Sequence, residues 1–537
     1  MHPYTVETFT PAEAAALEPF VTNLDQPVFA LTHLPEVVKG ALFSRYSRSP
    51  KSLRRLFLDE FADDVAPPAA QVGAEPGAGT DAGRAAQLYE RVFVEYGDDS
   101  VAQLGGAHVA VEQASNLLTK VLEWGRLGAY LEQSTRYIPY DDQPGGRYRY
   151  LRDPDIMTSR HAEAYERELD ASFDTYAALL PRVRAWAEAR FPREQGAAHG
   201  AYRRTVTAKV CDLLRGLLPA ATLSNVGIFA SGQSYEQLLL RLRSHELAEA
   251  RQTGAALLGE LRAVIPSFLT RVDRPDRGGV WSDYLAQTRG ATRQVAEELL
   301  TGEPVLEAPE VQLVAWSPDA DTELVTGILY PHSHLPEAQL RRVVEAMPAA
   351  ERARVVRAWV GERGNRRHKP GRALERITYR FDVCSDYGAF RDLQRHRMLT
   401  IEWQELSPLH GYDTPHELVE AGVEAEWHQT LERQASLWER LHGDLPRQAQ
   451  YAVGLAYRIR YSLHLNARAA MQMLELRTGP QGHASYRRVC QQMHRLIAAE
   501  AGHGAVAELM CFVDHSTGDL ERLAAEQVQE ARRAARA

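Results

Sequence analysis

The spacing of apolar side chains along the chain predicts many helices and a few strands. Apolar residues recur every three or four positions in several long stretches, as a helix with one buried face requires. Three shorter stretches alternate apolar and polar residues or carry β-branched and aromatic ones, which is typical of strands. We therefore expect an α+β fold in which long helices pack on a small sheet. The predicted helices cover Val92–Tyr96, Val101–Leu122, 160–190, 203–218, 234–264, 416–442 and 446–476, and the predicted strands cover Glu310–Trp316, Glu323–Leu329 and Ile377–Val383.

Two segments interrupt this pattern and predict how the chain is divided. Residues 63–84 are rich in Pro, Gly and Ala and contain almost no large apolar side chain, so they predict a flexible insert. Pro266–Gly279 contains RVDRPDRGG, which is typical of a boundary between folded units. We therefore expect a first unit over 1–270, a linker over 271–305 and a second unit over 306–537.

The two halves of the chain repeat one another weakly. Leu238–Arg243 reads LLLRLR, and Met471–Arg477 reads MQMLELR. A histidine follows each segment, His245 in the first half and His483 in the second. Similarity of this kind between two halves indicates a duplicated unit. We therefore interpret the chain as two diverged copies in tandem.

The composition excludes several classes of protein. The 537 residues include 71 acidic and 62 basic side chains, and the net charge of −9 excludes a chain-wide basic surface for nucleic acid. No run of 18 apolar residues occurs and the first residues do not resemble a secretory signal, so we expect a cytoplasmic protein without membrane spans. The four cysteines form no C-x-x-C pair. His332 and His334 lie in PHSHLP, which is more typical of a surface turn than of a metal site, so we expect no metal.

Two short clusters of polar residues are candidates for chemistry. The first is R-H-R at 395–397, which is either a solvated basic turn or a clamp for phosphate or pyrophosphate, whose oxygens match the forked donors of arginine. The second is E-Q-S-T-R at 132–136, where a hydroxyl and a guanidinium on one turn could converge on a single phosphate. Its alternative is an ordinary polar helix end. Each cluster alone is a weak signal.

Together, these clusters resemble motifs of the flavin-dependent thymidylate synthase family. That family carries R-H-R followed after seven residues by Ser, and later a helix similar to N-A-R with L-x-L-R. The first half contains WGRLGAYLEQSTRY at 124–137, in which seven residues separate Arg126 from Ser134. The second half contains RHRMLTIEWQELS at 395–407, where the spacing is two residues longer, and then LNARAAMQMLELR at 465–477. The resemblance covers about half the chain, over roughly 90–240 and 365–490.

The two halves depart from the family motifs at different positions. The first half lacks the R-H of the flavin motif and the N-A-R, whereas the second lacks the arginine that follows the Ser. The departures are Trp124, Gly125, Gly232 and Ser234 in the first half, and Asp392 in place of Gln, the segment after Ser407, and Gln450 in the second. Because these losses are complementary, the resemblance implies composite sites in which the first half binds the nucleotide and the second half binds the flavin.

The resemblance assigns a role to each retained residue. It implies flavin contacts for Arg395, His396, Arg397, Asn466 and Arg468, substrate contacts for Glu132, Ser134, Arg136 and Arg215, and a catalytic role beside the uracil carbonyl for Arg477 or Arg243. In such enzymes the bound flavin carries the redox chemistry, and the protein positions and polarises the substrate.

The activity that the resemblance implies is the reductive methylation of deoxyuridylate (dUMP) to thymidylate (dTMP). It implies FAD as cofactor, methylenetetrahydrofolate as one-carbon donor and NADPH as reductant. Two chains are expected to pair as a homodimer that reproduces the four units of the family's tetramers. One alternative is a flavin- or nucleotide-binding paralogue without thymidylate synthase activity. Another is a different flavin-dependent methylation of a uracil-containing substrate.

Overall fold

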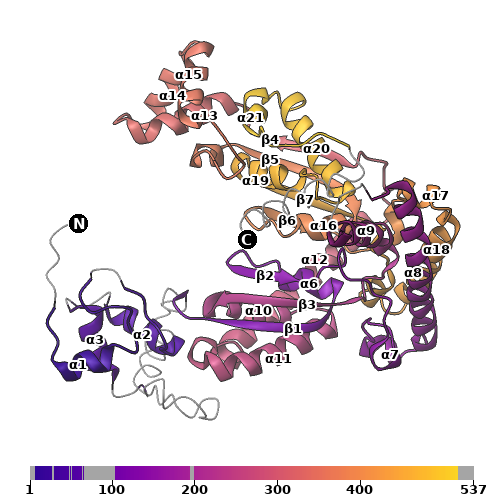
Figure 1. The fold of residues 1–537 in the computed structure, drawn as a ribbon, viewed down its shortest axis with the longest axis horizontal. Helices are drawn as coiled ribbons and strands as arrows, with labels where there is room; N and C mark the ends of the chain where they lie inside the picture. The colour runs from indigo at the N-terminus through magenta and orange to yellow at the C-terminus, as the bar shows by residue number, and fades with distance from the viewer. Residues whose placement is uncertain are drawn as a thin grey trace. The chain divides into compact units, whose positions relative to one another are not determined.

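The computed structural model describes residues 7–26, 29–46, 49, 51–62, 65, 103–193 and 199–517, and Figure 1 shows their elements. The chain divides into two compact units, each assembled from separate segments. Unit 1 contains segments 1–112, 121–132 and 225–303, and unit 2 contains segments 113–120, 133–224 and 304–537. The predicted helix at Val92–Tyr96 and, apart from Val65, the predicted insert at 63–84 lie outside the described residues.

Unit 1 combines a small sheet with helices. The sheet has the strand order β1-β3-β2. Strand β2 (Gly128–Glu132) pairs antiparallel with β3 (Leu223–Ser231), from Gly128 opposite Ala230 to Glu132 opposite Val226. Helix α10 packs against α11 and α12. The chain passes between the units within β1 (Gly106–Ser115), α6 (Asn116–Leu122) and β3 (Leu223–Ser231). The other elements of unit 1 are α1 (Pro11–Leu17), α2 (Glu36–Tyr46), α3 (Leu53–Glu60), β2 (Gly128–Glu132), α10 (Gly232–Arg243), α11 (Ala248–Val264) and α12 (Val280–Leu300).

Unit 2 is built on a four-stranded antiparallel sheet. The strands are β4 (Val311–Trp316), β5 (Thr378–Asp386), β6 (Thr400–Trp403) and β7 (Arg458–Asn466), in the order β4-β5-β7-β6. Ile459, Tyr461, Leu463 and Leu465 of β7 are buried and alternate with more exposed residues, as a strand with one face in the core requires. Helix α20 (Ala484–Ala499) packs on β4 and β5 and also contacts α16 (Tyr387–Leu393) and α19 (Ala467–Arg477).

A second layer of unit 2 consists of long helices. The 29-residue helix α8 (Ala162–Arg190) buries Tyr165, Leu169 and Phe173 at helical spacing. It packs against α9 (His199–Leu214) and α18 (Glu424–His442), and Figure 1 shows α8 and α18 side by side. The remaining helices of unit 2 are α7 (Pro154–Met157), α13 (Ala320–Leu329), α14 (Glu337–Glu345), α15 (Ala349–Val360), α17 (His416–Glu420) and α21 (Gly504–Leu509).

The α+β prediction is confirmed, as are the strands predicted at Glu310–Trp316 and Ile377–Val383. The strand predicted at Glu323–Leu329 is wrong, because this segment lies in α13. Its buried Leu324, Val325 and Ile328 lie at helical spacing, and Val325 packs with Leu340 and Val344 of α14. The β-branched residues that suggested a strand fit a helix equally well when their partner is another helix.

Two predicted helices contain a strand in the structure. In Val101–Leu122, the described part forms strand β1 and the short helix α6. In 446–476, strand β7 precedes α19, because the alternating sequence RIRYSLHLN buries every second residue. The predicted helix at 234–264 is two helices, α10 and α11.

Within the described residues, no helix combines the length and apolarity that crossing a membrane requires.

A close approach between two segments of unit 2 fixes the backbone that follows α9. Gly216 follows Arg215 in a short 3-10 turn, and its carbonyl accepts a hydrogen bond from the backbone of Ala456 at 3.0 Å. A Cβ at Gly216 would lie 2.9 Å from the Cβ of Ala456 and would overlap the ring of Trp427. Glycine is therefore required here for packing.

We predict that Gly216→Ala lowers the free energy of unfolding by about 1–3 kcal/mol, the usual cost of overpacking a core. Gly443→Ala is the matched control, because a Cβ there meets no atom within 4 Å and the backbone is helical. Urea denaturation measures both variants. Equal stability of Gly216→Ala and the parent would contradict the packing described here.

Helix α20 begins with a histidine whose neutral form serves as the cap. The Nδ1 atom of His483 accepts the N–H of Ser485 at 3.2 Å, and Nε2 faces the backbone carbonyl of Asp212 at 3.4 Å. Desolvation of the ring and the nearby charge of Arg215 lower the pKa of His483 from 6.5 to about 3. A protonated ring would lose the cap, since Nδ1 could no longer accept.

We predict that this histidine makes the fold acid-sensitive. Its folded-state pKa is depressed, so its contribution is complete above the unfolded pKa of 6.5 and is lost as pH falls toward 3. Between pH 6.5 and 5.5 the parent should lose ~1 kcal/mol more unfolding free energy than His483→Asn, which keeps a capping side chain but does not titrate. Urea denaturation at several pH values measures this difference. His416→Asn, at a side chain that is 78% exposed, should keep the parent's pH dependence.

Candidate active site

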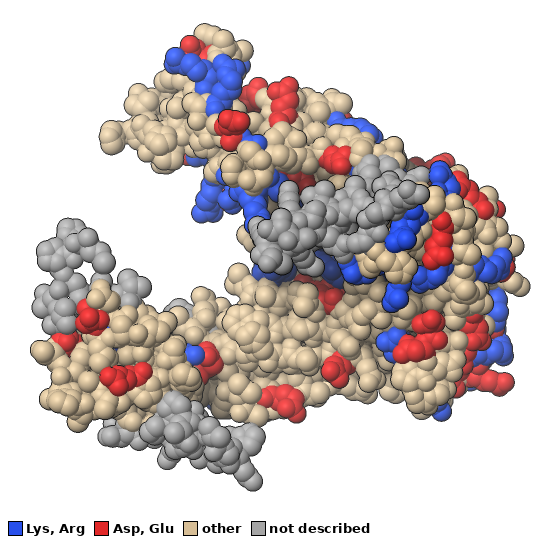
Figure 2. All heavy atoms as spheres, in the orientation of Figure 1, with Lys and Arg blue, Asp and Glu red and all other residues tan. Residues whose placement is uncertain are grey.

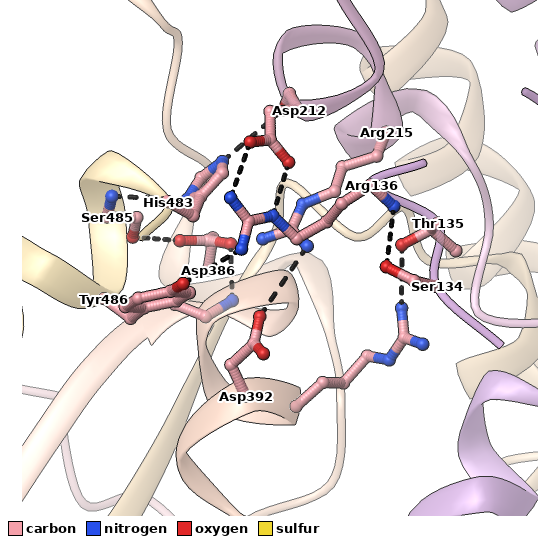
Figure 3. Close-up of polar contacts among 12 residues, drawn as sticks. Ser134, Thr135, Arg136, Asp212, Arg215, Asp386, Asp392, His483, Ser485 and Tyr486 are labelled. Atoms are coloured by element: carbon pink, nitrogen blue, oxygen red, sulfur yellow. Dashed lines mark hydrogen bonds and ion pairs between the residues drawn. The ribbon is translucent and has the colours of Figure 1, made fainter. Parts of the chain in front are cut away.

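A cavity of about 510 Å³ lies in unit 2. Its walls come from α9 and the turn after it, from the segment around 413–417, and from the start of α20. Arg136, Asp212 and Arg215 line it from one side, and Asp386 and His483 line it from another. The cavity therefore collects charged side chains from segments that are far apart in the sequence, and Figure 3 shows how these residues lie.

Arg136 is held by a dense set of acceptors. Its Nε and Nη2 donate to the two carboxylate oxygens of Asp212 at 2.7 and 2.8 Å. Its Nη1 donates to the hydroxyl of Tyr486 at 2.9 Å, and Nη2 also donates to the carbonyl of Gln481 at 3.2 Å. The Ser134 hydroxyl oxygen accepts the backbone N–H of Arg136 at 3.2 Å, which forms the turn that aims this arginine inward. Arg136 is thus fixed by the protein itself.

Arg215 is different, because it keeps an unsatisfied donor. Its side chain is only 5% exposed, and its Nη2 has no hydrogen-bond partner within the part of the chain that the structure describes. Its nearest carboxylate contact is 3.8 Å, from Nη1 to Asp392. A Cβ at position 388 would lie 3.0 Å from Nη2 and 2.9 Å from Oδ1 of Asp386, so Gly388 leaves room for both groups. A buried cation with an open donor on a cavity wall favours an anionic ligand.

Asp386 adds a carboxyl group to this region. It caps α16 by accepting the N–H of Ala389 at 2.8 Å, and it also accepts a hydrogen bond from the hydroxyl of Ser485. Burial raises the pKa of Asp386 although Arg215 and these hydrogen bonds oppose the shift.

A second arginine is fixed by the R-H-R segment. Arg477, at the end of α19, donates from Nε to Nε2 of His396 at 2.9 Å, from Nη1 to Oδ1 of Asp392 at 3.1 Å, and from Nη2 to the backbone carbonyl of Asp392 at 2.5 Å. Burial and the charge of Arg477 lower the pKa of His396 to about 3, so the ring is neutral and can accept this bond. Burial would raise the pKa of Asp392, but Arg477 and Arg395 hold it well below its usual range.

Tyr486 connects the two arginines. Its hydroxyl accepts from Arg136, and its ring centre lies 5.7 Å from the guanidinium carbon of Arg136 and 5.4 Å from that of Arg477. Such cation–π contacts orient both guanidinium groups. The structure therefore brings Arg136, Arg215, His396 and Arg477 into one cluster of unit 2.

Other residues with predicted roles lie elsewhere. Glu132 ends β2 and is buried, and Arg243 ends α10; both are residues of unit 1. Asn466 caps α19 by accepting the N–H of Ala469 at 2.8 Å. Arg468, two residues further on, contacts Glu375 at 3.1 Å. Since α19 has 11 residues, Asn466 and Arg477 are roughly 15 Å apart along the helix.

The R-H-R segment and the first turn of α19 border a basic region. Arg395 and Arg397 are partly exposed in the turn between α16 and β6. Arg468 donates to the carbonyl of Pro370 at 3.4 Å, which joins α19 to a loop whose exposed residues include Arg366, Arg367 and Lys369. Figure 2 shows Lys and Arg side chains gathered where Figure 1 labels α19. Such a group of cations attracts anions in general.

Sequence reasoning missed two members of the cluster. Asp212 belongs to no recognised motif, although its position three residues before Arg215 places the two side chains on one face of the helical segment. Tyr486 lay in the repeated stretch but received no role, because its contact with Arg136 joins residues 350 positions apart.

Among the described residues, no group of three or more His, Cys, Asp or Glu side chains is arranged to hold a metal ion.

Comparisons with known proteins agree with the duplicated architecture. Residues 60–267 and 312–501 match the profile of a family described as thymidylate synthase complementing protein. A UPF0159 protein of Chlamydia pneumoniae is 41% identical over 532 residues, covering 98% of both chains. A UPF0159 protein of Chlamydia muridarum is 40% identical over 528 residues, covering 97% of this chain and 99% of the relative.

One solved structure that also matches is flavin-dependent thymidylate synthase ThyX from Helicobacter pylori, complexed with FAD and dUMP. It is 16% identical, with a TM-score of 0.28, and the match covers 38% of this chain and 98% of that one. The two segments that match the family profile confirm the tandem arrangement predicted from the sequence. The chain therefore belongs to the thymidylate synthase complementing protein family, as two diverged copies in tandem.

Proposed function

We propose that this chain is a flavin-dependent enzyme that methylates dUMP to dTMP, using methylenetetrahydrofolate as one-carbon donor and NADPH as reductant. The observation that carries the proposal is the cluster in unit 2, where a buried arginine with an open donor, Arg215, lines a cavity beside Arg136. Membership of the family supports the reaction class. Arg215, with Ser134 and Arg136 beside it, would receive the nucleotide phosphate.

The cysteines support a route without a thiol nucleophile. None of the four cysteines lines the cavity. Burial raises the pKa of Cys211 to about 11 and that of Cys490 to about 12, so both remain protonated thiols. Methylation at this site therefore needs a reaction that does not begin with thiolate attack on the uracil ring, as the family resemblance implies.

Arg477 is the proposed catalytic residue. It uses three of its five N–H donors on His396 and Asp392, which leaves one on each terminal nitrogen. Placed near a uracil carbonyl, these donors would stabilise negative charge as it develops on the ring. His396 and Asp392 hold the guanidinium in place before the substrate arrives, so no reorganisation is needed during the reaction.

The residues of unit 2 fit a flavin dinucleotide. Arg395 and His396 would lie toward the isoalloxazine end, and Asn466 and Arg468 toward the adenosine end, with Arg397 between them at the basic region. When bound, the flavin supplies the redox chemistry of the reaction. The roles that the resemblance implies for Glu132 and Arg243, both residues of unit 1, stay predictions. We also propose that two chains pair as a homodimer that reproduces a four-unit assembly.

A second candidate function is supported by the internal ion pairs. Arg136 is already paired with Asp212, and Arg477 with Asp392. A paralogue that binds flavin or nucleotide without making dTMP would retain such pairs as structural elements. Product formation distinguishes the two candidates.

We predict that the purified chain carries flavin absorbance and forms dTMP from dUMP, methylenetetrahydrofolate and NADPH. Arg477→Ala should lower kcat/KM by roughly 100-fold or more, because a donor to the transition state is lost. Arg354→Ala, at a side chain that is 75% exposed on α15, should have no effect. Bound flavin without any dTMP in the parent would favour the non-synthesising paralogue.

We predict that Arg395→Ala abolishes flavin retention while the chain stays folded. Arg395 is the first residue of R-H-R, and it lies 3.9 Å from Asp392, a pair of modest strength at this distance. The ratio of flavin to protein absorbance after gel filtration measures retention, and circular dichroism checks the fold. Unchanged flavin affinity would dismiss the assignment of R-H-R to the cofactor.

A further inference from the structure

The phosphate contact assigned to Arg136 is already occupied by a group of the protein. A guanidinium has five N–H donors, and Arg136 directs two of them at Asp212, one at Tyr486 and one at the carbonyl of Gln481. A guanidinium has two edges that can make a forked, two-bond contact with a phosphate. In Arg136 the Nε/Nη2 edge pairs with Asp212, and the Nη1/Nη2 edge donates to Tyr486 and Gln481. A phosphate can therefore reach the Nε/Nη2 edge only if the carboxylate of Asp212 moves away.

Asp212 carries its charge at neutral pH. Burial would raise its pKa, but the charge of Arg136 and the hydrogen bonds from it outweigh that effect and hold the pKa at about 2. The carboxylate lines the cavity beside the arginine that it neutralises. A phosphate in this cavity would therefore meet a paired arginine and a nearby negative charge, and both weaken its binding.

The other charges around the cavity do not cancel in the same way. Among the described residues, Nη2 of Arg215 has no hydrogen-bond partner, and Nη1 lies 3.8 Å from the carboxylate of Asp392. Burial raises the pKa of Asp386, the carboxyl group that lines another part of the same cavity. One arginine thus attracts an anion while its neighbour is neutralised by the protein. The cavity is therefore lined by a guanidinium that attracts an anion, Arg215, and by a carboxylate that competes with that anion, Asp212.

We propose that Asp212 competes with the substrate's phosphate for Arg136 and thereby sets how strongly the cavity prefers nucleotides over nucleosides. The inference rests on the proposed function, since it concerns the same pocket. The relevant ligand class is a phosphate monoester of a uracil nucleoside. Asp212 acts through Arg136 on the phosphate and does not touch the reacting ring.

The test is the removal of the competing charge. Asp212→Asn keeps the shape of the side chain and one acceptor for Arg136, but it frees part of the paired edge and leaves a buried cation to be neutralised. We expect the Kd for dUMP to fall about ten-fold or more, as a regained charged hydrogen bond allows. The Kd for deoxyuridine should not change, and inorganic phosphate should bind more tightly. Isothermal titration calorimetry on the full-length chain measures all three ligands.

Two further variants distinguish the loss of a negative charge in general from the loss of competition for Arg136. Asp444→Asn removes the same charge from a carboxylate that also pairs with an arginine, Arg160 at 2.7 Å, but that does not line the cavity; its dUMP affinity should match the parent's. Arg136→Gln combined with Asp212→Asn should lose the gain, because the arginine that benefits is gone.

Several results would overturn the proposal. They are unchanged or weaker phosphate binding in Asp212→Asn, an equal gain for deoxyuridine, and failure of both Asp212→Asn and Asp212→Ser to fold, which would make the residue structural. The proposed function fails separately. If Asp212→Asn binds phosphate more tightly but neither protein forms dTMP, competition at Arg136 stands and the synthase activity does not.

Discussion

Pairing between arginines and carboxylates in the interior of unit 2 is the interaction on which the candidate site depends. A buried guanidinium is costly unless acceptors surround it, and removing one member of such a pair leaves the other charge uncompensated. Asp212 satisfies Arg136, Asp392 satisfies Arg477, and Tyr486 lies between the two arginines. These acids fix the guanidinium groups in one geometry, so the cluster is organised before any ligand enters.

The same pairs show how the duplicated sequence forms one unit. Arg136 and Asp212 come from the first half, whereas Asp392 and Arg477 come from the second, yet all four belong to unit 2. The first half retained the serine and arginine of the nucleotide motif, and the second retained R-H-R. Because one cluster draws on both halves, each copy could lose the motif that the other supplies. The domain boundaries at 270 and 306 stay predictions.

The sequence was sufficient for features that depend on local pattern, and insufficient for those that depend on distant partners. The strand at 377–383 and the helix at 160–190 follow from short-range periodicity. Glu323–Leu329 was misread because its Val325 packs with Leu340 and Val344 of helix α14 rather than within a sheet. The arginines of the cluster could be predicted from motifs. Asp212 and Tyr486 could not, because their roles follow from contacts with Arg136 that the sequence does not reveal. The individual roles assigned to the site residues remain predictions.

The acids that organise the site also limit what it can bind. A carboxylate beside an arginine preorganises the guanidinium, which favours catalysis, but it uses the donors that an anionic substrate would need. At Arg477 the conflict is small, because each terminal nitrogen keeps one hydrogen that is not donated to Asp392. At Arg136 it is large, because both atoms of the paired edge are engaged with Asp212. Under the proposed function Arg215 would relieve the conflict, because its Nη2 has no hydrogen-bond partner among the described residues and its ion pair with Asp392 is long, at 3.8 Å. The cavity thus combines one arginine that is held in a fixed orientation, Arg136, with one that attracts an anion, Arg215. A single guanidinium cannot do both at full strength, because the carboxylate that orients it also uses its donors.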